Sequence, residues 1–275
     1  QGTRPGYSTY ERTTFKDDTT YFITSEGEQM RQRNFWMFRG GAGYNLTDRD
    51  IFNFEFNYGY SQYESSADLN YQEWVEPGFG IDPYISQESG RRAGNFYSFS
   101  LAYRHDFQKK GHFLDALAEY RSREGEDTSG NQLLDMDQNI SSGQINTEDG
   151  PGAVLQLNLD YTLPLGENNK LEAGYQSRLG NSRDATSLSF YDPTGNEYVL
   201  QPEFTNVTDY RRDIHALYGI YAGESERFGY QIGLRGEYTY RLINSRALDS
   251  EFIIDRLDYF PTLHTSYKLP AEQQV

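Results

Sequence analysis

Apolar and polar side chains alternate strictly along residues 52–61 of this chain. Every even position there is phenylalanine or tyrosine, and every odd position is polar or glycine. A period of two is that of a β-strand, which places successive side chains on opposite faces. The same alternation recurs in residues 97–104, 155–165 and 230–238. The chain is therefore predicted to be all-β, built from antiparallel strands with one apolar and one polar face.

Tyrosines recur at one end of these alternating runs, each just before a short polar turn. Tyr44, Tyr103, Tyr161 and the weaker copy Tyr218 follow one another at gaps of 59, 58 and 57 residues, and Tyr267 closes the series. A single strand cannot fill such a period, but a long hairpin can. A tyrosine fixed at one end of every second strand suggests an up-and-down barrel whose strands meet one interface. We predict that these five tyrosines form an aromatic girdle at a membrane surface.

Composition narrows the class of protein. The 275 residues are 36% hydrophobic and 16% aromatic, with a mean hydropathy of −0.82. Because no apolar stretch reaches about 18 residues, a transmembrane helix is excluded, and the start at Gln1 shows no signal peptide. With no cysteine, the chain has no disulfide framework and no thiolate metal site. A net charge of −16 argues against nucleic acid as a partner.

The connections between the predicted strands alternate between short and long. Tight turns are predicted at residues 47–50, 108–111, 166–169, 224–227 and 270–273, and long loops at 64–92, 123–151, 180–209 and 244–258. Outer-membrane barrels have short periplasmic turns and longer external loops. A soluble sandwich, the alternative for an amphipathic sheet, has no reason to keep this alternation over successive hairpins. The pattern favours a transmembrane barrel.

The number of strands indicates only part of a barrel. Eleven are predicted, at residues 8–16, 19–28, 33–46, 51–63, 95–107, 113–123, 153–165, 170–179, 211–222, 228–243 and 257–269. The first two are either one irregular hairpin or part of the preceding loop. A barrel in lipid must close, usually with an even number of strands, and the sequence stops at Val275 where another strand would begin. We expect residues 1–275 to be a single β-barrel segment without a plug domain and without the closing C-terminal strands.

Three segments carry a family resemblance. They are residues 39–48 (RGGAGYNLTD), 228–238 (FGYQIGLRGEY) and 258–269 (DYFPTLHTSYKL). They resemble barrel strands of TonB-dependent outer-membrane receptors, particularly the Bacteroidetes-type outer-membrane barrel family. The resemblance implies a 22-stranded barrel in a Gram-negative outer membrane, an internal N-terminal plug, and import energised through a TonB box. Of these parts, we expect residues 1–275 to contain barrel strands but neither the plug nor the TonB box. The implied partners are outer-membrane lipid, the TonB complex through the plug, a small solute and, by family analogy, a surface lipoprotein.

The first predicted long loop holds the candidate ligand-binding residues. Tyr71, Trp74, Phe79 and Tyr84 gather aromatic rings that stack on sugars, haem, peptides or catecholates about equally well. In an outer-membrane receptor they would form the mouth of the ligand site. The alternative is a small core within the loop around its two prolines. A soluble carbohydrate-binding sheet protein would use the same rings as stacking platforms.

Metal, cofactor and catalytic sites are weakly indicated. The four histidines lie apart without metal-ligand spacing, so we expect no metal and no cofactor. The acidic residues at 127–139 lack the twelve-residue register of an EF-hand, and we expect a solvated loop there, with a calcium site as the alternative. Asp213 and His215 share one strand face and Ser177 comes from the strand before, which would suit an outer-membrane hydrolase. Such trios arise by chance in a polar lumen, and we expect a receptor that binds and imports a nutrient or siderophore-like solute, not an enzyme.

Overall fold

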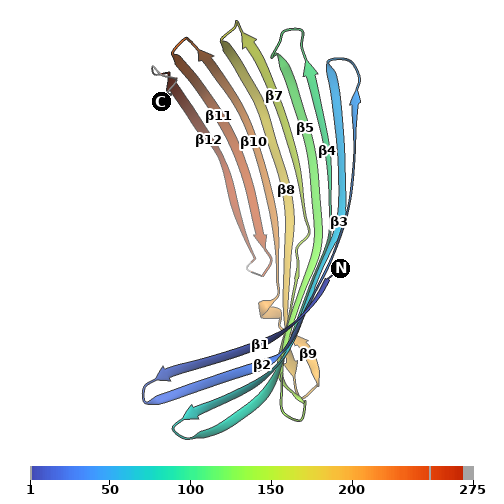
Figure 1. Ribbon diagram of the computed structural model, residues 1–275, viewed down its shortest axis with the longest axis vertical. Coiled ribbons are helices and arrows are strands. Elements are labelled where there is room, and N and C mark those ends of the chain that lie inside the picture. Colours follow the sequence, from blue (N-terminus) through green and yellow to red (C-terminus); the bar gives the residue numbers. More distant parts are fainter. Residues whose placement is uncertain (1, 248, 269–275) are drawn as a thin grey trace.

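A single antiparallel sheet of twelve strands makes up almost the whole molecule (Figure 1). The computed structural model describes residues 2–247 and 249–268. The strands are β1 (Gly2–Lys16), β2 (Thr19–Asn45), β3 (Asp50–Glu76), β4 (Phe79–Asp106), β5 (Phe113–Leu134), β6 (Ile140–Asp149), β7 (Gly152–Leu165), β8 (Asn169–Asp192), β9 (Glu197–Leu200), β10 (Asn206–Glu224), β11 (Phe228–Ser245) and β12 (Ser250–Tyr267), with one short 3₁₀ helix, η1 (Pro202–Phe204). None of the described helical residues forms a helix long and apolar enough to cross a membrane.

The strands follow one another across the sheet in chain order, with two local exceptions. Among the described residues β9 pairs only with β8, which also pairs with β10, and the other exception is at β6 and β7. β5 pairs with β7 through residues 113–123 and with β6 through residues 126–134, and β8 pairs with both. Strands β6 and β7 therefore act as one strand of the sheet that is interrupted at Gly150 and Pro151. Proline has no backbone N–H to donate to a ladder. Its carbonyl oxygen still accepts a 3.0 Å hydrogen bond from the Arg183 N–H, which keeps the interrupted strand tied to β8.

The strands are longer than the sequence pattern indicates. The segments predicted as two strands at residues 19–28 and 33–46 are the single 27-residue strand β2. The predicted long loops at 64–92, 123–151, 180–209 and 244–258 are mostly continuations of the hairpins. In the first of them β3 and β4 stay paired from Tyr63 opposite Arg92 to the turn at Gly78, whose φ of 119° suits glycine. The loop prediction was wrong because these outer parts of the hairpins carry polar side chains on both faces. The backbone can still pair there, although the sequence no longer alternates between apolar and polar residues.

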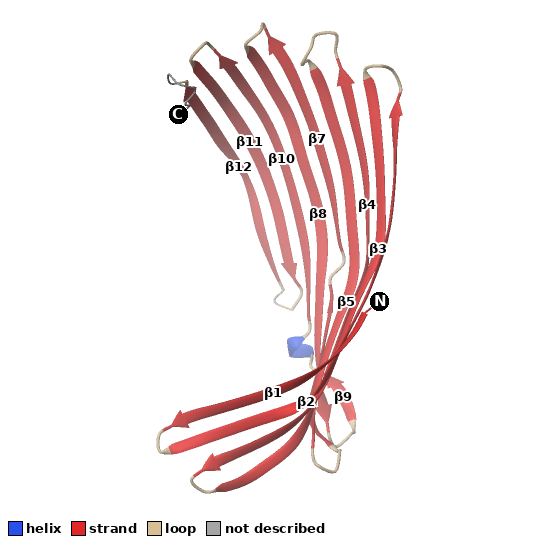
Figure 2. Cartoon of the chain, viewed as in Figure 1, coloured by secondary structure: helices blue, strands red, loops and turns tan. Residues whose placement is uncertain are grey.

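Four of the predicted tight turns are confirmed. β2 and β3 are joined across residues 46–49, β4 and β5 across 107–112, β7 and β8 across 166–168, and β10 and β11 across 225–227. The fifth, predicted at 270–273, lies outside the described residues. All four turns stand at one end of the sheet (Figure 2).

At the other end, the hairpins β1–β2 and β3–β4 bend away from the wall of the sheet (Figure 1). We call residues 2–30 and 66–89 the extension. A small core lies at its base, where Ser25, Leu69, Ser86 and Leu134 are each no more than 9% exposed. Gly27 lies in the same region, where β2 and β3 come very close together. A Cβ atom on Gly27 would lie 1.9 Å from the Asp68 carbonyl oxygen. Close backbone packing therefore fixes the bend.

The wall has two chemically different faces. Residues directly opposite one another in a sheet share a face, so the pairings define rows across it. One row is Phe52, Tyr103, Ala116, Leu159, Tyr175, Leu217, Gly236 and Tyr259, and the row one residue away, on the other face, is Ile51, Arg104, Asp115, Asp160, Gly174, Tyr218, Arg235 and Phe260. We call these the apolar face and the polar face. Leu217 on the apolar face is 69% exposed, whereas its neighbour Ala216 on the polar face is 2% exposed.

The rows also show that the strands are staggered. The row that begins at Ile51, next to the first turn, reaches β12 at Phe260, seven residues before Tyr267, the last residue of that strand. The line of turns therefore runs obliquely to the hydrogen-bonding direction. This oblique stagger is the shear that a sheet needs to close into a barrel with tilted strands. Among the described residues β12 pairs only with β11, so the sheet is an open segment of a barrel wall.

Candidate ligand-binding groove

The four aromatic residues predicted to bind ligand lie on the extension, where they are divided between two faces. Tyr71 on β3 stacks on Tyr84 of β4, with ring centroids 5.0 Å apart and planes 2° apart. Trp74 lies three residues further along β3, which places it on the opposite face, and it stacks on Phe22 of β2 at 5.0 Å. The side chain of Phe79 lies outside the described part of the structure. The structure thus brings two of the four predicted residues together and separates the third from them.

The Tyr71–Tyr84 pair has a polar group beside it. The Tyr84 hydroxyl donates a 2.6 Å hydrogen bond to Glu73 Oε1. Burial and this carboxylate together raise the pKa of Tyr84, so the phenol stays protonated at neutral pH. A flat pair of rings with a carboxylate at its edge can stack on a planar or sugar ring and accept a hydrogen bond from it.

Four of the five predicted girdle tyrosines lie on the apolar face near the tight turns. They are Tyr44, Tyr103, Tyr161 and Tyr267. The Tyr103 hydroxyl donates to Asp50 at 2.8 Å, beside the first turn, and the Tyr161 hydroxyl lies 2.8 Å from Nε2 of His112 in the second. Rings on the apolar face with hydroxyls bonded at the turns suit a membrane interface, and the girdle stays a prediction for these four.

Tyr218 does not belong to that series. It lies on the polar face, where its hydroxyl donates to Asp160 and its ring covers Gly174. The outward position is taken by Leu217 instead. A shift of one residue moves a side chain to the other face of a strand, and β10 has apolar residues at both even and odd positions, so spacing alone could not fix the face of Tyr218.

The trio considered for hydrolysis is partly assembled, on the apolar face. Ser177 Oγ lies 3.1 Å from Nδ1 of His215, and the same nitrogen lies 2.8 Å from the Tyr175 hydroxyl. Asp213 is held by Arg211 at 2.7 Å. Ser177 is 3% exposed, so its hydroxyl is covered. A nucleophile must reach its substrate, and here the imidazole instead lies within hydrogen-bond distance of one buried and one half-buried hydroxyl.

The acidic residues weighed as calcium ligands have structural partners. Asp127 on β5 binds Arg92 of β4, with Nε at 2.7 Å. Asp135 accepts hydrogen bonds from the backbone N–H groups of Asp137 and Asn139, both at 2.9 Å, and these bonds lower its pKa. Within residues 2–247 and 249–268, no group of three or more histidine and carboxylate side chains is arranged to hold a metal ion. These carboxylates close a turn and join two strands.

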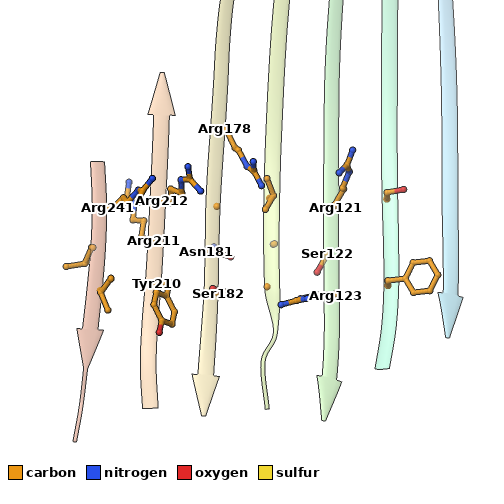
Figure 3. A pocket seen from close by; sticks show the side chains of 18 of the residues that line it. Arg121, Ser122, Arg123, Arg178, Asn181, Ser182, Tyr210, Arg211, Arg212 and Arg241 are labelled. Atoms are coloured by element: carbon orange, nitrogen blue, oxygen red, sulfur yellow. The ribbon is translucent and has the colours of Figure 1, made fainter. Parts of the chain in front are cut away.

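A groove that the sequence analysis missed lies on the polar face, across β4, β5, β7, β8, β10 and β11 (Figure 3). Its volume is about 640 Å³, in the range of small-molecule sites. Its polar lining is unusual for a chain of net charge −16, because it includes six arginines and, among the described residues, no acidic side chain. The arginines are Arg121, Arg123, Arg178, Arg211, Arg212 and Arg241.

The register places five of these arginines on the polar face. Arg121, Arg212 and Arg241 share one cross-strand row, which also contains Ser98, Val154 and Gly180. Arg212 and Arg241 are directly opposite each other, and Arg178 lies one diagonal step from Arg212. Figure 3 shows Arg212 beside Arg241, whereas the Arg178 side chain extends from β8 toward β7. We call Arg123, Arg178, Arg212 and Arg241 the arginine cluster. The sequence signal for this cluster was that each arginine occupies a polar-face position of its strand. That signal can be recognised only once the pairing register is known.

Within the described residues, no member of the arginine cluster has a carboxylate within 4.0 Å. By contrast, Arg121 is held by Glu119 at 2.7 Å, and Arg211, on the apolar face, is held by Asp213. Nε of Arg241 is buried without a hydrogen-bond partner among the described atoms. The groove therefore presents positive charge and unused N–H donors.

A family model agrees with the architecture. It is described as "Outer membrane protein beta-barrel family" and matches residues 105–275. A search of curated proteins finds no match to the chain. Among solved structures, the ferric citrate transporter FecA in its unliganded form aligns with 98% of this chain at 10% identity and a TM-score of 0.47. The siderophore receptor PiuA from Acinetobacter baumannii aligns with 98% at 9% identity and 0.42, and the outer membrane protease OmpT from Escherichia coli with 96% at 8% identity and 0.26. The chain spans 42% of the FecA chain, 45% of PiuA and 93% of OmpT.

Proposed function

Because the chain belongs to the outer membrane protein β-barrel family and resides in a Gram-negative outer membrane, we propose that it forms part of the barrel of a TonB-dependent receptor that binds and imports a small solute. In such a barrel the apolar face contacts lipid and the polar face lines the lumen. The chain's own part would be to enclose the passage and to bind the solute.

The observation that carries this proposal is the groove on the polar face. A barrel that served only as a membrane anchor would need no concave site of about 640 Å³ lined by convergent donors. The resemblance of residues 39–48, 228–238 and 258–269 to barrel strands of TonB-dependent receptors is the reason for proposing TonB-dependent transport. Energy coupling would come through a plug, and capture of solute at the cell surface would involve the extension, with Tyr71 and Tyr84 as its stacking platform.

No catalytic step is part of the proposal. The Ser177–His215 contact lies on the lipid-facing side with the serine covered, and Asp213 is engaged by Arg211. The proposed chemistry is reversible binding.

Uptake measurements on the full-length protein in its native cells test the transport class. We expect deletion of its gene to abolish uptake of one solute from a panel of iron chelates, haem, oligosaccharides, peptides and organic anions. Deletion of TonB should abolish uptake of the same solute. Replacing Tyr84 with alanine should weaken capture at low solute concentration, whereas Trp74→Ala, on the opposite face, is the matched control.

Two results would contradict the proposal. One is uptake of the whole panel that is unchanged by either deletion. The other is passive entry of many solutes that depends on this protein but not on TonB, which would identify a diffusion pore.

A further inference from the structure

We infer that the groove selects a small polyanion, a solute carrying at least two carboxylate or phosphate groups, and that the arginine cluster binds it. This inference rests on the proposed function and names the chemical class of the solute.

The first argument is the charge arrangement. Arg212 and Arg241 occupy directly opposite positions on neighbouring strands, and like charges placed so are destabilising. Arg178 adds a third positive charge that repels Arg212. A chain with 41 acidic and only 25 basic residues nevertheless lines one groove with six arginines, and the four of the arginine cluster have no described carboxylate within 4.0 Å. An anionic ligand that bridges the cluster turns this repulsion into attraction.

The second argument is the donor geometry. An arginine presents a planar fork of N–H groups that matches carboxylate and phosphate oxygens in pairs. The cluster comes from β5, β8, β10 and β11, so its forks approach the groove from several strands and can engage more than one anionic group at once. The buried, unpartnered Nε of Arg241 is one such donor.

The size and position of the groove favour a solute over a protein partner. A volume of about 640 Å³ holds one small molecule. The cluster stands in the wall of the barrel, on the path that an imported solute would follow. Carboxylates of a plug segment could occupy the same donors, and the experiment separates the two occupants.

Binding measurements on the full-length receptor in detergent test the inference. Isothermal titration calorimetry with citrate, pyrophosphate and inositol hexakisphosphate as probes should show saturable binding of at least one of them, weakened by added salt. The double variant Arg212→Gln, Arg241→Gln should bind that probe about tenfold or more weakly, since hydrogen bonds to charged groups are removed. Arg256→Gln is the control. Arg256 on β12 lies on the polar face, like the arginine cluster, but it is held by Asp258 at 2.8 Å. Heat-modifiable gel migration verifies that each variant is folded.

The anion site is overturned if no probe binds the folded wild-type receptor, as expected when a plug occupies the cluster, or if the double variant binds as tightly as the wild type. TonB-dependent import of an uncharged or cationic solute, unchanged in the double variant, would also overturn it while the transport class stands. Polyanion binding by the wild type that the double variant loses, without any TonB-dependent import, would keep the anion site and remove the transport class.

Discussion

At the scale of single residues, the Tyr218 ring packs closely over Gly174 in the wall. A Cβ atom on Gly174 would lie 2.5 Å from Cζ of the Tyr218 ring, whose hydroxyl is held by Asp160. The ring covers the glycine and fills the space that a side chain would otherwise occupy. Rings placed over strand glycines are a recognised way of stabilising a curved sheet.

We expect Gly174→Ala to destabilise the folded full-length protein by about 1–3 kcal/mol, because the ring must move and give up Asp160. Gly219→Ala is the control: Gly219 lies on the same strand as Tyr218, and no atom would come within 4 Å of its Cβ. Urea unfolding in lipid vesicles measures the difference. Equal midpoints for the two variants would show that the ring adapts without cost.

Some residue roles could be predicted from the sequence and others could not. The positions of Tyr44, Tyr103, Tyr161 and Tyr267 on the apolar face followed from alternation, because the neighbouring positions in their strands differ strongly in polarity. Tyr218 was assigned to the wrong face because β10 lacks that contrast. The arginine cluster was missed because its members come from four strands, and only the register shows that they converge.

At the scale of elements, the outer ends of three strands are tied together by one carboxylate. Asp209 on β10 accepts a 2.8 Å hydrogen bond from Nε of Arg183 on β8 and lies 3.3 Å from Nη2 of Arg246, in the turn between β11 and β12. The hydrogen bond from Arg183, and then the charges of both guanidinium groups, lower the pKa of Asp209. The pairs are partly exposed, and such surface pairs contribute little to global stability. Their effect is local ordering of the hairpin ends.

This tie should loosen in acid. A lowered pKa means that the stabilising charge is fully present above the ordinary aspartate value of about 3.9 and is lost as the pH falls through the lower folded value. We expect hydrogen exchange around Arg246, whose N–H donates to the Val207 carbonyl oxygen, to be slower in the wild type than in Asp209→Asn at pH 7. The two should converge as the pH falls through the lowered pKa of Asp209. A difference that persists unchanged through that range would rule out the carboxylate as its cause.

The elements also show which part of the fold a pattern can reveal. The strand segments next to the tight turns were predicted close to their observed positions, and four of the five predicted turns were confirmed. The same strands continue far past the roughly 9–11 residues that a bilayer requires, and β4 reaches 28 residues. Beyond the bilayer, neither face of a strand must be apolar. The alternation of apolar and polar side chains therefore fades, while the backbone hydrogen-bond ladder continues. Long polar hairpins therefore look like loops in the sequence.

At the scale of the whole molecule, the two tryptophans report different surroundings. Trp36 on β2 lies on the apolar face of the wall, 48% exposed, with its ring edge-on to Tyr58 at 5.2 Å. Trp74 lies on the extension, stacked on Phe22. If the apolar face contacts lipid and the extension projects from the membrane, only Trp36 is within reach of the acyl chains.

Brominated phospholipids quench tryptophan fluorescence on contact, which turns this arrangement into a measurement. In vesicles of the full-length protein, we expect Trp36→Phe to remove most of the bromine-sensitive emission that this chain contributes and Trp74→Phe to remove almost none of it. Bromine near the headgroup end of the acyl chain should quench Trp36 more than bromine near the bilayer centre, because Trp36 stands eight residues along β2 from Tyr44, toward the opposite membrane surface. Equal loss of bromine-sensitive emission in the two variants would place the extension in lipid, whereas no loss in Trp36→Phe would show that the apolar face does not contact lipid.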